Sequence, residues 1–150
     1  MFRIIGLGLA AVIVSCAPVR MVIREGKEMP LEEAARIDFA TAEKAFSLGK
    51  DDEALKGFKL VVERYPESRP APLALLRQGQ IEYKRENLHG AMVFFQRVLE
   101  AYPGSSVAPE ARFQLALCDH RLGLYNDAIQ ILKRLVDAGL EPSKEVTASY

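Results

Sequence analysis

The chain has 150 residues, the usual size of a single domain, and 49% of them are hydrophobic, which is enough for a real core. Twenty basic and twenty acidic residues cancel to a formal net charge of zero. A nucleic-acid-binding domain normally carries a clustered basic surface, so this balance argues against DNA or RNA as the partner.

The first sixteen residues differ in character from the rest of the chain. Met1, Phe2 and Arg3 give a short positive start, and residues 4–14 are an unbroken apolar or glycine run. Such a run is too short for a membrane-spanning helix, which needs about 20 residues, but it suits the apolar core of an export signal. A buried amino-terminal helix is the alternative.

The apolar run ends in Ile13, Val14, Ser15 and Cys16. This order resembles the bacterial lipobox, in which an aliphatic and a small residue precede a cysteine that is diacylated before the chain is cut in front of it. The resemblance implies a lipoprotein signal peptide over residues 1–15 and a mature chain that carries fatty acid, such as palmitate, on Cys16. More than one acyl chain makes anchoring stable, at about 0.8 kcal/mol per buried methylene.

The residue after the cysteine bears on location. In lipoproteins of Gram-negative envelopes, Asp at that position favours retention in the inner membrane, and here Ala17 follows instead. The resemblance therefore implies that the protein is lipid-anchored in the bacterial outer membrane and faces the periplasm.

Residues 16–30 are expected to form the lipidated amino terminus and a tether. Pro18 and Pro30 bracket the segment, Gly26 interrupts it, and no apolar period runs through it. This composition predicts a flexible leash. Packing of residues 21–23 on the edge of the domain is the alternative.

Residues 31–150 are expected to form one repeat domain, because its apolar pattern recurs every 37 residues. One copy of the pattern consists of Ala91, Phe95, Val98, Leu99, Tyr102 and Pro103, preceded at the same offsets by Ala54, Phe58, Val61, Val62, Tyr65 and Pro66. In the forward direction the pattern continues through Ala128, Leu132, Leu135 and Val136, and breaks at Gly139 and Leu140. Self-similarity of this length indicates a solenoid, whose units cannot bury their apolar faces alone.

Helix-boundary residues place two helices in each repeat. Pro30, Pro72 and Pro109 suit first turns, and Gly49 and Gly123 suit helix ends. The candidate amino-terminal caps are Asp51 or Asp52, Ser106, and Asn126 or Asp127. Where the helices of a hairpin cross closely, Ala42, Gly79 and Ala116 are expected to face Ala54, Ala91 and Ala128.

These residues carry a resemblance to the tetratricopeptide repeat, which has small residues at its eighth and twentieth positions, an aromatic at the twenty-fourth and Pro at the thirty-second. The matching residues are Ala42, Ala54, Phe58 and Pro66, then Gly79, Ala91, Phe95 and Pro103, then Ala116, Ala128 and Leu132. Leu140 replaces the third Pro, and Thr41 and Gln78 stand where the family prefers apolar residues. The expected fold is all-α: a tetratricopeptide-like solenoid with hairpins over about 31–66, 67–103 and 104–140.

The family's usual period is 34 residues, so each repeat here has a longer turn between hairpins. Tyr-Pro-x-Ser segments fill that turn at residues 65–68 and 102–105. This variant resembles the repeats of periplasmic proteins related to BamD and CpoB.

The pattern also predicts the start of a fourth first helix over residues 143–150. Ser143 lies 37 residues after Ser106, and Tyr150 lies 37 residues after Phe113. The segment is either a short end cap or the beginning of a repeat in a longer protein, and we prefer the second interpretation.

No motif indicates an enzyme, a cofactor, a metal site or a small-molecule substrate. Cys118 is expected to be a small buried hydrophobe, and His120 occupies an aromatic position of the repeat. His89 is expected in a solvated turn. Asp119 and His120 are neighbours on a helix, so their side chains point about 100° apart, and no nucleophile accompanies them.

The tetratricopeptide resemblance implies that the first helices line a groove for an extended peptide or a partner segment. The expected groove residues are Glu43, Phe46, Ser47, Gln80, Tyr83, Lys84, Leu117, His120 and Arg121. The aromatic side chains would supply contact area, and Lys84 and Arg121 would hold a carboxylate or an acidic stretch. A solvated helical face is the alternative.

Two functions fit these expectations. The first is a lipid-anchored adaptor that binds partner proteins in outer-membrane and cell-envelope assembly, as BamD-like and CpoB-like proteins do. The second is the docking segment of a larger lipoprotein that activates a peptidoglycan synthase, similar to the LpoA type. An envelope hydrolase is disfavoured because no catalytic constellation is present.

Overall fold

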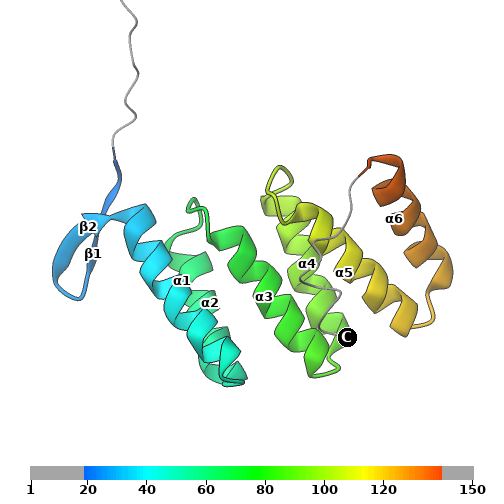
Figure 1. Cartoon of the computed structure of the whole chain (residues 1–150), viewed down its shortest axis with the longest axis horizontal. Helices are drawn as coiled ribbons and strands as arrows, with labels where there is room; N and C mark the ends of the chain where they lie inside the picture. Colours follow the sequence, from blue (N-terminus) through cyan, green and yellow to red (C-terminus); the bar gives the residue numbers. More distant parts are fainter. Residues whose placement is uncertain (1–18, 140–150) are drawn as a thin grey trace, which may run out of the picture.

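The computed structural model describes residues 19–139, in which a β-hairpin precedes six helices (Figure 1). The strands are β1 (Met21–Arg24) and β2 (Lys27–Pro30). The helices are α1 (Leu31–Ser47), α2 (Asp51–Arg64), α3 (Ala71–Lys84), α4 (Leu88–Ala101), α5 (Ala108–Arg121) and α6 (Tyr125–Asp137).

The helices form three hairpins that stack side by side. Helix α1 packs on α2, α3 on α4 and α5 on α6, while α2 contacts α3 and α4 contacts α5 (Figure 1). The helix positions follow the 37-residue period of the sequence, since α5 begins 37 residues after α3, and α6 begins 37 residues after α4. The all-α solenoid of three helical hairpins is thereby confirmed.

One continuous apolar core runs through the stack from α1 to α5. Its largest members, Phe58 and Phe95, are fully buried at equivalent positions of α2 and α4. The Phe58 ring lies 5.6 Å from the ring of Phe39 and 6.3 Å from that of Phe46, measured between centroids, so two turns of α1 close over it. Aromatic pairs at such distances add to the free energy gained by burial.

Two close helix crossings involve Ala42 and Gly79, which belong to the expected series of small residues. A Cβ on Gly57 would lie 2.7 Å from the Cβ of Ala42, and one on Gly79 would lie 2.4 Å from a ring carbon of Phe95. In the first hairpin both sides of the crossing are therefore small. In the second, Gly79 alone makes the room because a phenylalanine ring occupies the other side.

The expected amino-terminal caps are wrong. Lys50, Val107 and Leu124 occupy the cap positions of α2, α5 and α6, and none of them makes a side-chain capping bond. Asp51 and Asp52 instead lie in the first turn of α2, where negative charge is favourable. Asn87 is the side-chain cap of α4, and its Oδ1 accepts a hydrogen bond from the Gly90 N–H at 3.1 Å.

Residues 21–30 form an antiparallel hairpin, so the expectation of a flexible leash is wrong for this part of the chain. Glu25 and Gly26 form the two-residue turn, with φ values of 51° and 78°. Positive φ at both turn positions matches the right-handed twist of the flanking strands. Val22 faces Met29 across the hairpin, and both pack on the amino-terminal part of α1, whereas Met21 and Ile23 are exposed.

Polar contacts fasten the hairpin to the first repeat. Arg24 Nε donates to Asp38 Oδ1 at 2.8 Å, and the Tyr65 hydroxyl donates to Asp38 Oδ2 at 2.8 Å. Tyr65 also joins Leu31, Ala34 and Ala35 in a second apolar cluster beneath the strands. The hairpin therefore covers the α1 end of the solenoid.

The Tyr-Pro-x-Ser segments form equivalent turns. The N–H of Ser68 donates to the Tyr65 carbonyl at 3.0 Å, and that of Ser105 donates to the Tyr102 carbonyl at 3.0 Å. The Tyr102 hydroxyl also donates to the Pro66 carbonyl at 2.8 Å, which ties consecutive turns together. These bonds give the longer repeat a defined turn.

Several expectations concern residues outside the described range. They are the signal peptide over residues 1–15, the lipidation of Cys16 and the fourth helix over residues 143–150. Within residues 19–139, no helix combines the length and the apolar character needed to cross a bilayer.

Candidate partner-binding face

The predicted groove residues come from the first helix of each hairpin. Helices α1, α3 and α5 lie side by side, with α2 and α4 behind them (Figure 1), and we call this side of the stack the α1/α3/α5 face. Helix α1 carries Glu43, Phe46 and Ser47; α3 carries Gln80, Tyr83 and Lys84; α5 carries Leu117, His120 and Arg121.

Arg77 joins three of the predicted residues across the first two repeats. Its Nε donates to Glu43 Oε1 at 2.7 Å, and its Nη1 donates to Gln80 Oε1 at 2.9 Å. Its guanidinium carbon also lies 5.4 Å from the centroid of the Phe46 ring. Sequence reasoning missed Arg77, although its position one turn before Gln80 on the same helix could have revealed it.

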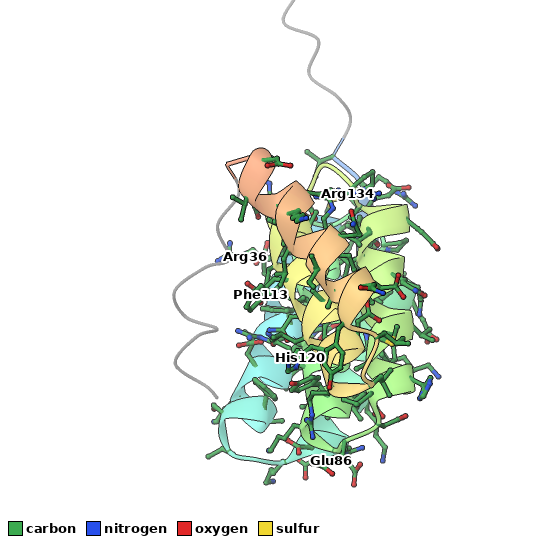
Figure 2. All side chains as sticks on the ribbon, turned by 90° about the vertical axis from the view of Figure 1, so that its right-hand side faces the viewer. Arg36, Glu86, Phe113, His120 and Arg134 are labelled. Carbon is green, nitrogen blue, oxygen red and sulfur yellow. The ribbon has the colours of Figure 1, made fainter. Side chains whose placement is uncertain are left out.

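A second cluster joins the second and third repeats. The guanidinium of Arg121 lies 5.1 Å from the centroid of the Tyr83 ring, and its Nη2 donates to Glu86 Oε1 at 2.9 Å. Hydrogen bonds to Glu86 and Tyr83 raise the pKa of Arg121 above its usual value. The ring of His120, which is labelled in Figure 2, lies edge-on to the ring of Tyr125, with 5.4 Å between the two centroids.

The two clusters share one arrangement. In each, an aromatic ring of one repeat is covered by a guanidinium from the next repeat, an attraction of about 0.5–1 kcal/mol at exposed sites. The arginines do not occupy equivalent positions, because the counterpart of Arg77 in α5 is Gln114. The arrangement therefore does not simply follow from the repeat pattern.

The two cations expected to hold an acidic partner already have acidic neighbours within the chain. Lys84 Nζ lies 3.1 Å from Asp51 Oδ2, and Arg121 pairs with Glu86. The Asp51 side chain is only 16% exposed, whereas both partners of the Arg121–Glu86 pair are exposed, and exposed ion pairs contribute little to stability. Replacement of Glu86 by another carboxylate beside Arg121 would therefore cost little.

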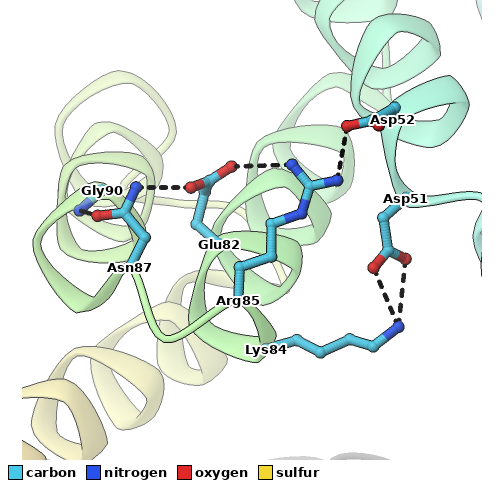
Figure 3. A network of polar contacts seen from close by, with 7 residues as sticks. All are labelled: Asp51, Asp52, Glu82, Lys84, Arg85, Asn87 and Gly90. Carbon is cyan, nitrogen blue, oxygen red and sulfur yellow. Dashed lines mark hydrogen bonds and ion pairs between the residues drawn. The ribbon is translucent and has the colours of Figure 1, made fainter.

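A polar network connects neighbouring turns at one edge of this face (Figure 3). Arg85 Nη2 donates to Asp52 Oδ1 at 2.7 Å, and Asn87 Nδ2 donates to Glu82 Oε2 at 2.6 Å. The hydrogen bond to Asp52 raises the pKa of Arg85. Together with the Lys84–Asp51 pair, the network joins the start of α2 to the α3–α4 turn.

The remaining candidate residues have structural surroundings. Cys118 is fully buried, as expected, and burial raises the pKa of its thiol to about 12, so the reactive thiolate is suppressed at neutral pH. Burial also raises the pKa of Asp119. His89 is exposed, but it lies in the first turn of α4. Across residues 19–139, no group of three or more His, Cys, Asp or Glu side chains is placed to hold a metal ion.

Stacked helical hairpins with a regular period define a repeat solenoid. Comparison with known families indicates which type of repeat the hairpins resemble. Two family models described as tetratricopeptide repeat match the chain, one over residues 39–68 and the other over residues 83–145. These two stretches therefore carry the sequence pattern of tetratricopeptide repeats, and the fold is tetratricopeptide-like. Neither matching model describes a catalytic family.

Two individual proteins are also similar to the chain. The CTR9 homolog of Arabidopsis thaliana is 32% identical over 88 residues, which make up 59% of this chain but only 8% of that protein. A solved structure titled "TPR2B-domain:pHsp70-complex of yeast Sti1" is similar with a TM-score of 0.55 and 17% identity, covering 69% of this chain and 75% of that chain. At this identity the structural likeness shows the fold alone.

Proposed function

We propose that the protein is a non-catalytic, lipid-anchored adaptor that faces the periplasm and binds partner proteins in outer-membrane and cell-envelope assembly. The observation that carries the adaptor role is the pair of ring-and-guanidinium clusters on the α1/α3/α5 face, Phe46 with Arg77 and Tyr83 with Arg121. Aromatic and arginine side chains dominate the binding energy of protein interfaces.

The chemistry of the face suits an extended segment with acidic groups. Each guanidinium already lies against a ring and beside a carboxylate, so its orientation is set before a partner arrives. Pre-organised groups lose less conformational entropy on binding. A fold neighbour solved as a pHsp70 complex gives further support to a protein partner.

Membrane attachment is supported from the amino-terminal side. The lipobox-like order of Ile13, Val14, Ser15 and Cys16 lies directly before the described chain. Val19, Met21 and Ile23, which are all exposed, follow within seven residues of Cys16. A lipid on Cys16 would hold these apolar side chains near the leaflet, where their exposure costs less than in water.

A second candidate is the docking segment of a larger lipoprotein that activates a peptidoglycan synthase, similar to the LpoA type. Ile129 and Val136 of α6 are exposed, whereas Val62, the counterpart of Val136 in α2, is buried, and this difference favours a repeat array that continues past α6. In that case the α1/α3/α5 face would serve as a docking arm, and a further part of the protein would act on the synthase.

The anchor is tested by following maturation in a Gram-negative host. The wild-type chain should incorporate labelled palmitate and accumulate as a precursor in globomycin, whereas Cys16→Ser should remain unprocessed. The variant Cys118→Ser is the matched control and should mature normally. Maturation that is insensitive to globomycin would refute the lipid anchor.

The partner is tested by purifying the lipidated protein from detergent with its bound proteins. Recovery of barrel-assembly components without a wall synthase supports the adaptor, and the reverse result supports the activator segment. In either case Tyr83→Ala and Arg121→Ala should reduce recovery at least tenfold. Arg97→Ala, an exposed arginine on α4, should leave recovery unchanged.

A further inference from the structure

The two faces of the β-hairpin have different surroundings. Val22 and Met29 pack on the apolar surface of α1. Successive side chains of a strand point to opposite faces, so Met21 and Ile23 point away from the solenoid, and both are exposed. Val19, two residues before Met21, is exposed as well. We call Val19, Met21 and Ile23 the outer apolar row.

Polar contacts hold the outer apolar row in a fixed direction relative to the helices. Arg64 Nη2, at the end of α2, donates to the Ile23 carbonyl at 3.0 Å. The Leu31 N–H donates to the Arg20 carbonyl at 2.7 Å, and the Arg20 guanidinium forms an ion pair with Glu67. The start of the described chain is therefore joined to α1, to α2 and to the first Tyr-Pro-x-Ser turn.

The described chain begins at the same edge of the stack as both Tyr-Pro-x-Ser turns, at residues 65–68 and 102–105 (Figure 1). We call this edge the turn edge. Leu48, which follows α1, lies at the opposite edge, because the 17 residues of α1 rise by about 25 Å. The outer apolar row and Leu48 therefore mark opposite edges of the solenoid.

The position of Cys16 in the sequence limits its distance from this edge. Cys16 lies three residues before Val19. An extended chain spans at most about 3.6 Å per residue, so in any conformation the two Cα atoms are at most about 11 Å apart. Apolar groups of interfacial elements enter a leaflet to a depth of about 5–10 Å. A lipid on Cys16 would therefore bring the outer apolar row within reach of the boundary between headgroups and acyl chains.

The charges of the hairpin favour apolar contact with such a boundary. Lys27 is exposed, but the exposed carboxylates of Glu25 and Glu28 flank it in the sequence. The hairpin therefore has no basic cluster of the kind that attracts anionic headgroups. Burial of apolar surface remains as the source of attraction, and salt does not screen it.

Resting on the lipid anchor of the proposed function, we propose that the outer apolar row enters the boundary between headgroups and acyl chains of the leaflet. The turn edge of the solenoid then faces the membrane, and the helices extend away from it. In this orientation the α1/α3/α5 face stands beside the leaflet and stays open to a partner.

Tryptophan fluorescence tests the contact, because the sequence contains no tryptophan and a single introduced one reports alone. Ile23→Trp and Leu48→Trp are matched variants, since Ile23 is 67% and Leu48 63% exposed. The purified lipidated protein is placed in phosphatidylethanolamine and phosphatidylglycerol vesicles whose acyl chains carry bromine near the headgroup. Emission of Ile23→Trp should shift to shorter wavelength and fall about threefold, because tryptophan settles at the membrane interface. Emission of Leu48→Trp should not change.

The outcomes that overturn the proposal are distinct. An unquenched Ile23→Trp refutes the contact, and equal quenching of Ile23→Trp and Leu48→Trp refutes the orientation. Met21→Trp repeats the measurement at a second position of the row and should give the same result as Ile23→Trp. A shift that appears without vesicles and grows with protein concentration would assign the row to a second copy.

Two further measurements separate the contact from the anchor. The mass of the purified protein reports the acyl chains: their absence refutes the anchor and the contact together, whereas acylated protein with an unquenched Ile23→Trp keeps the anchor and refutes only the contact. Raising the salt concentration from about 0.1 M to about 0.5 M should leave the quenching unchanged. Loss of quenching at high salt would refute the apolar contact.

Discussion

The hydroxyl of Tyr65, at the end of α2, donates a 2.8 Å hydrogen bond to the carboxylate of Asp38 in α1. The same carboxylate accepts a hydrogen bond from Arg24 of the β-hairpin at 2.8 Å. One side chain thus connects the amino-terminal hairpin to both helices of the first repeat. Tyr65 is fully buried, so water cannot replace the Asp38 carboxylate. If that carboxylate is lost, the Tyr65 hydroxyl has no hydrogen-bond acceptor.

Asp38→Ala should therefore lower the free energy of unfolding by about 1–3 kcal/mol, the usual cost of a buried polar group left unpaired. Tyr65→Phe removes only the hydroxyl and should cost about 1 kcal/mol. Urea unfolding measures both values. Glu33→Ala, at an exposed position on the same helix, is the control, and equal losses for Asp38→Ala and Glu33→Ala would contradict the linking role.

Ala91 tests the packing of the central hairpin. This residue of α4 is fully buried, so Ala91→Leu has to push the helices apart and should cost about 1–3 kcal/mol. Thermal melting should show a lower midpoint. Ala101→Leu makes the same change at an exposed position of α4 and should leave the midpoint nearly unaltered. An unchanged midpoint for Ala91→Leu would refute the packing.

Gly79 tests the close approach of α3 to Phe95. An added Cβ would lie 2.4 Å from the Phe95 ring, inside van der Waals contact. Alanine favours helix over glycine by about 1 kcal/mol, but the clash should exceed this gain, and we expect Gly79→Ala to lose about 1–2 kcal/mol overall. Denaturant unfolding measures the balance.

Gly104→Ala is the control for that measurement, because a Cβ there would meet no atom within 4 Å. Its stability should stay within about 0.5 kcal/mol of the wild type. A stabilising Gly79→Ala would show that the Phe95 ring can move aside freely, which would contradict its tight packing against α3.

Cys118 should make the protein less stable at alkaline pH. Its thiol has a pKa of about 12 in the folded chain and about 8.5 in an unfolded chain. A pKa raised by folding contributes stability that is fully present below the unfolded pKa and is lost as pH rises to the folded value. The free energy of unfolding should therefore fall between about pH 9 and pH 12.

Cys118→Ala should reduce the slope of that decline, as measured by urea unfolding at successive pH values. The slope should not vanish, because burial also raises the pKa of Tyr65 and Tyr102, and these groups contribute in the same direction. The same slope in the wild type and in Cys118→Ala would contradict the buried, protonated thiol.

Much of the repeat architecture could be predicted from local patterns. Apolar residues spaced for helices, together with Pro72, Pro109 and Gly123, located the helices to within a few residues. The predicted binding residues also fell on α1, α3 and α5. Such patterns can be read from sequence because a helix brings together residues only three or four positions apart.

Other features depended on contacts between distant residues. Arg77 became part of the candidate site only because Glu43 and Phe46 of the preceding repeat lie opposite it. Lys84 likewise binds Asp51, 33 residues earlier in the chain, and Arg121 binds Glu86, 35 residues earlier. Local sequence patterns do not predict such contacts.

The sequence by itself determined the 37-residue period, the all-α class and the pairing of helices into hairpins, because each follows from the order of apolar and small residues along the chain. Only the tertiary structure decided that residues 21–30 form a β-hairpin. Two four-residue strands bury too little surface to be stable alone. They are held because Val22 and Met29 meet the apolar surface of α1 and because Asp38 supplies an acceptor to Arg24.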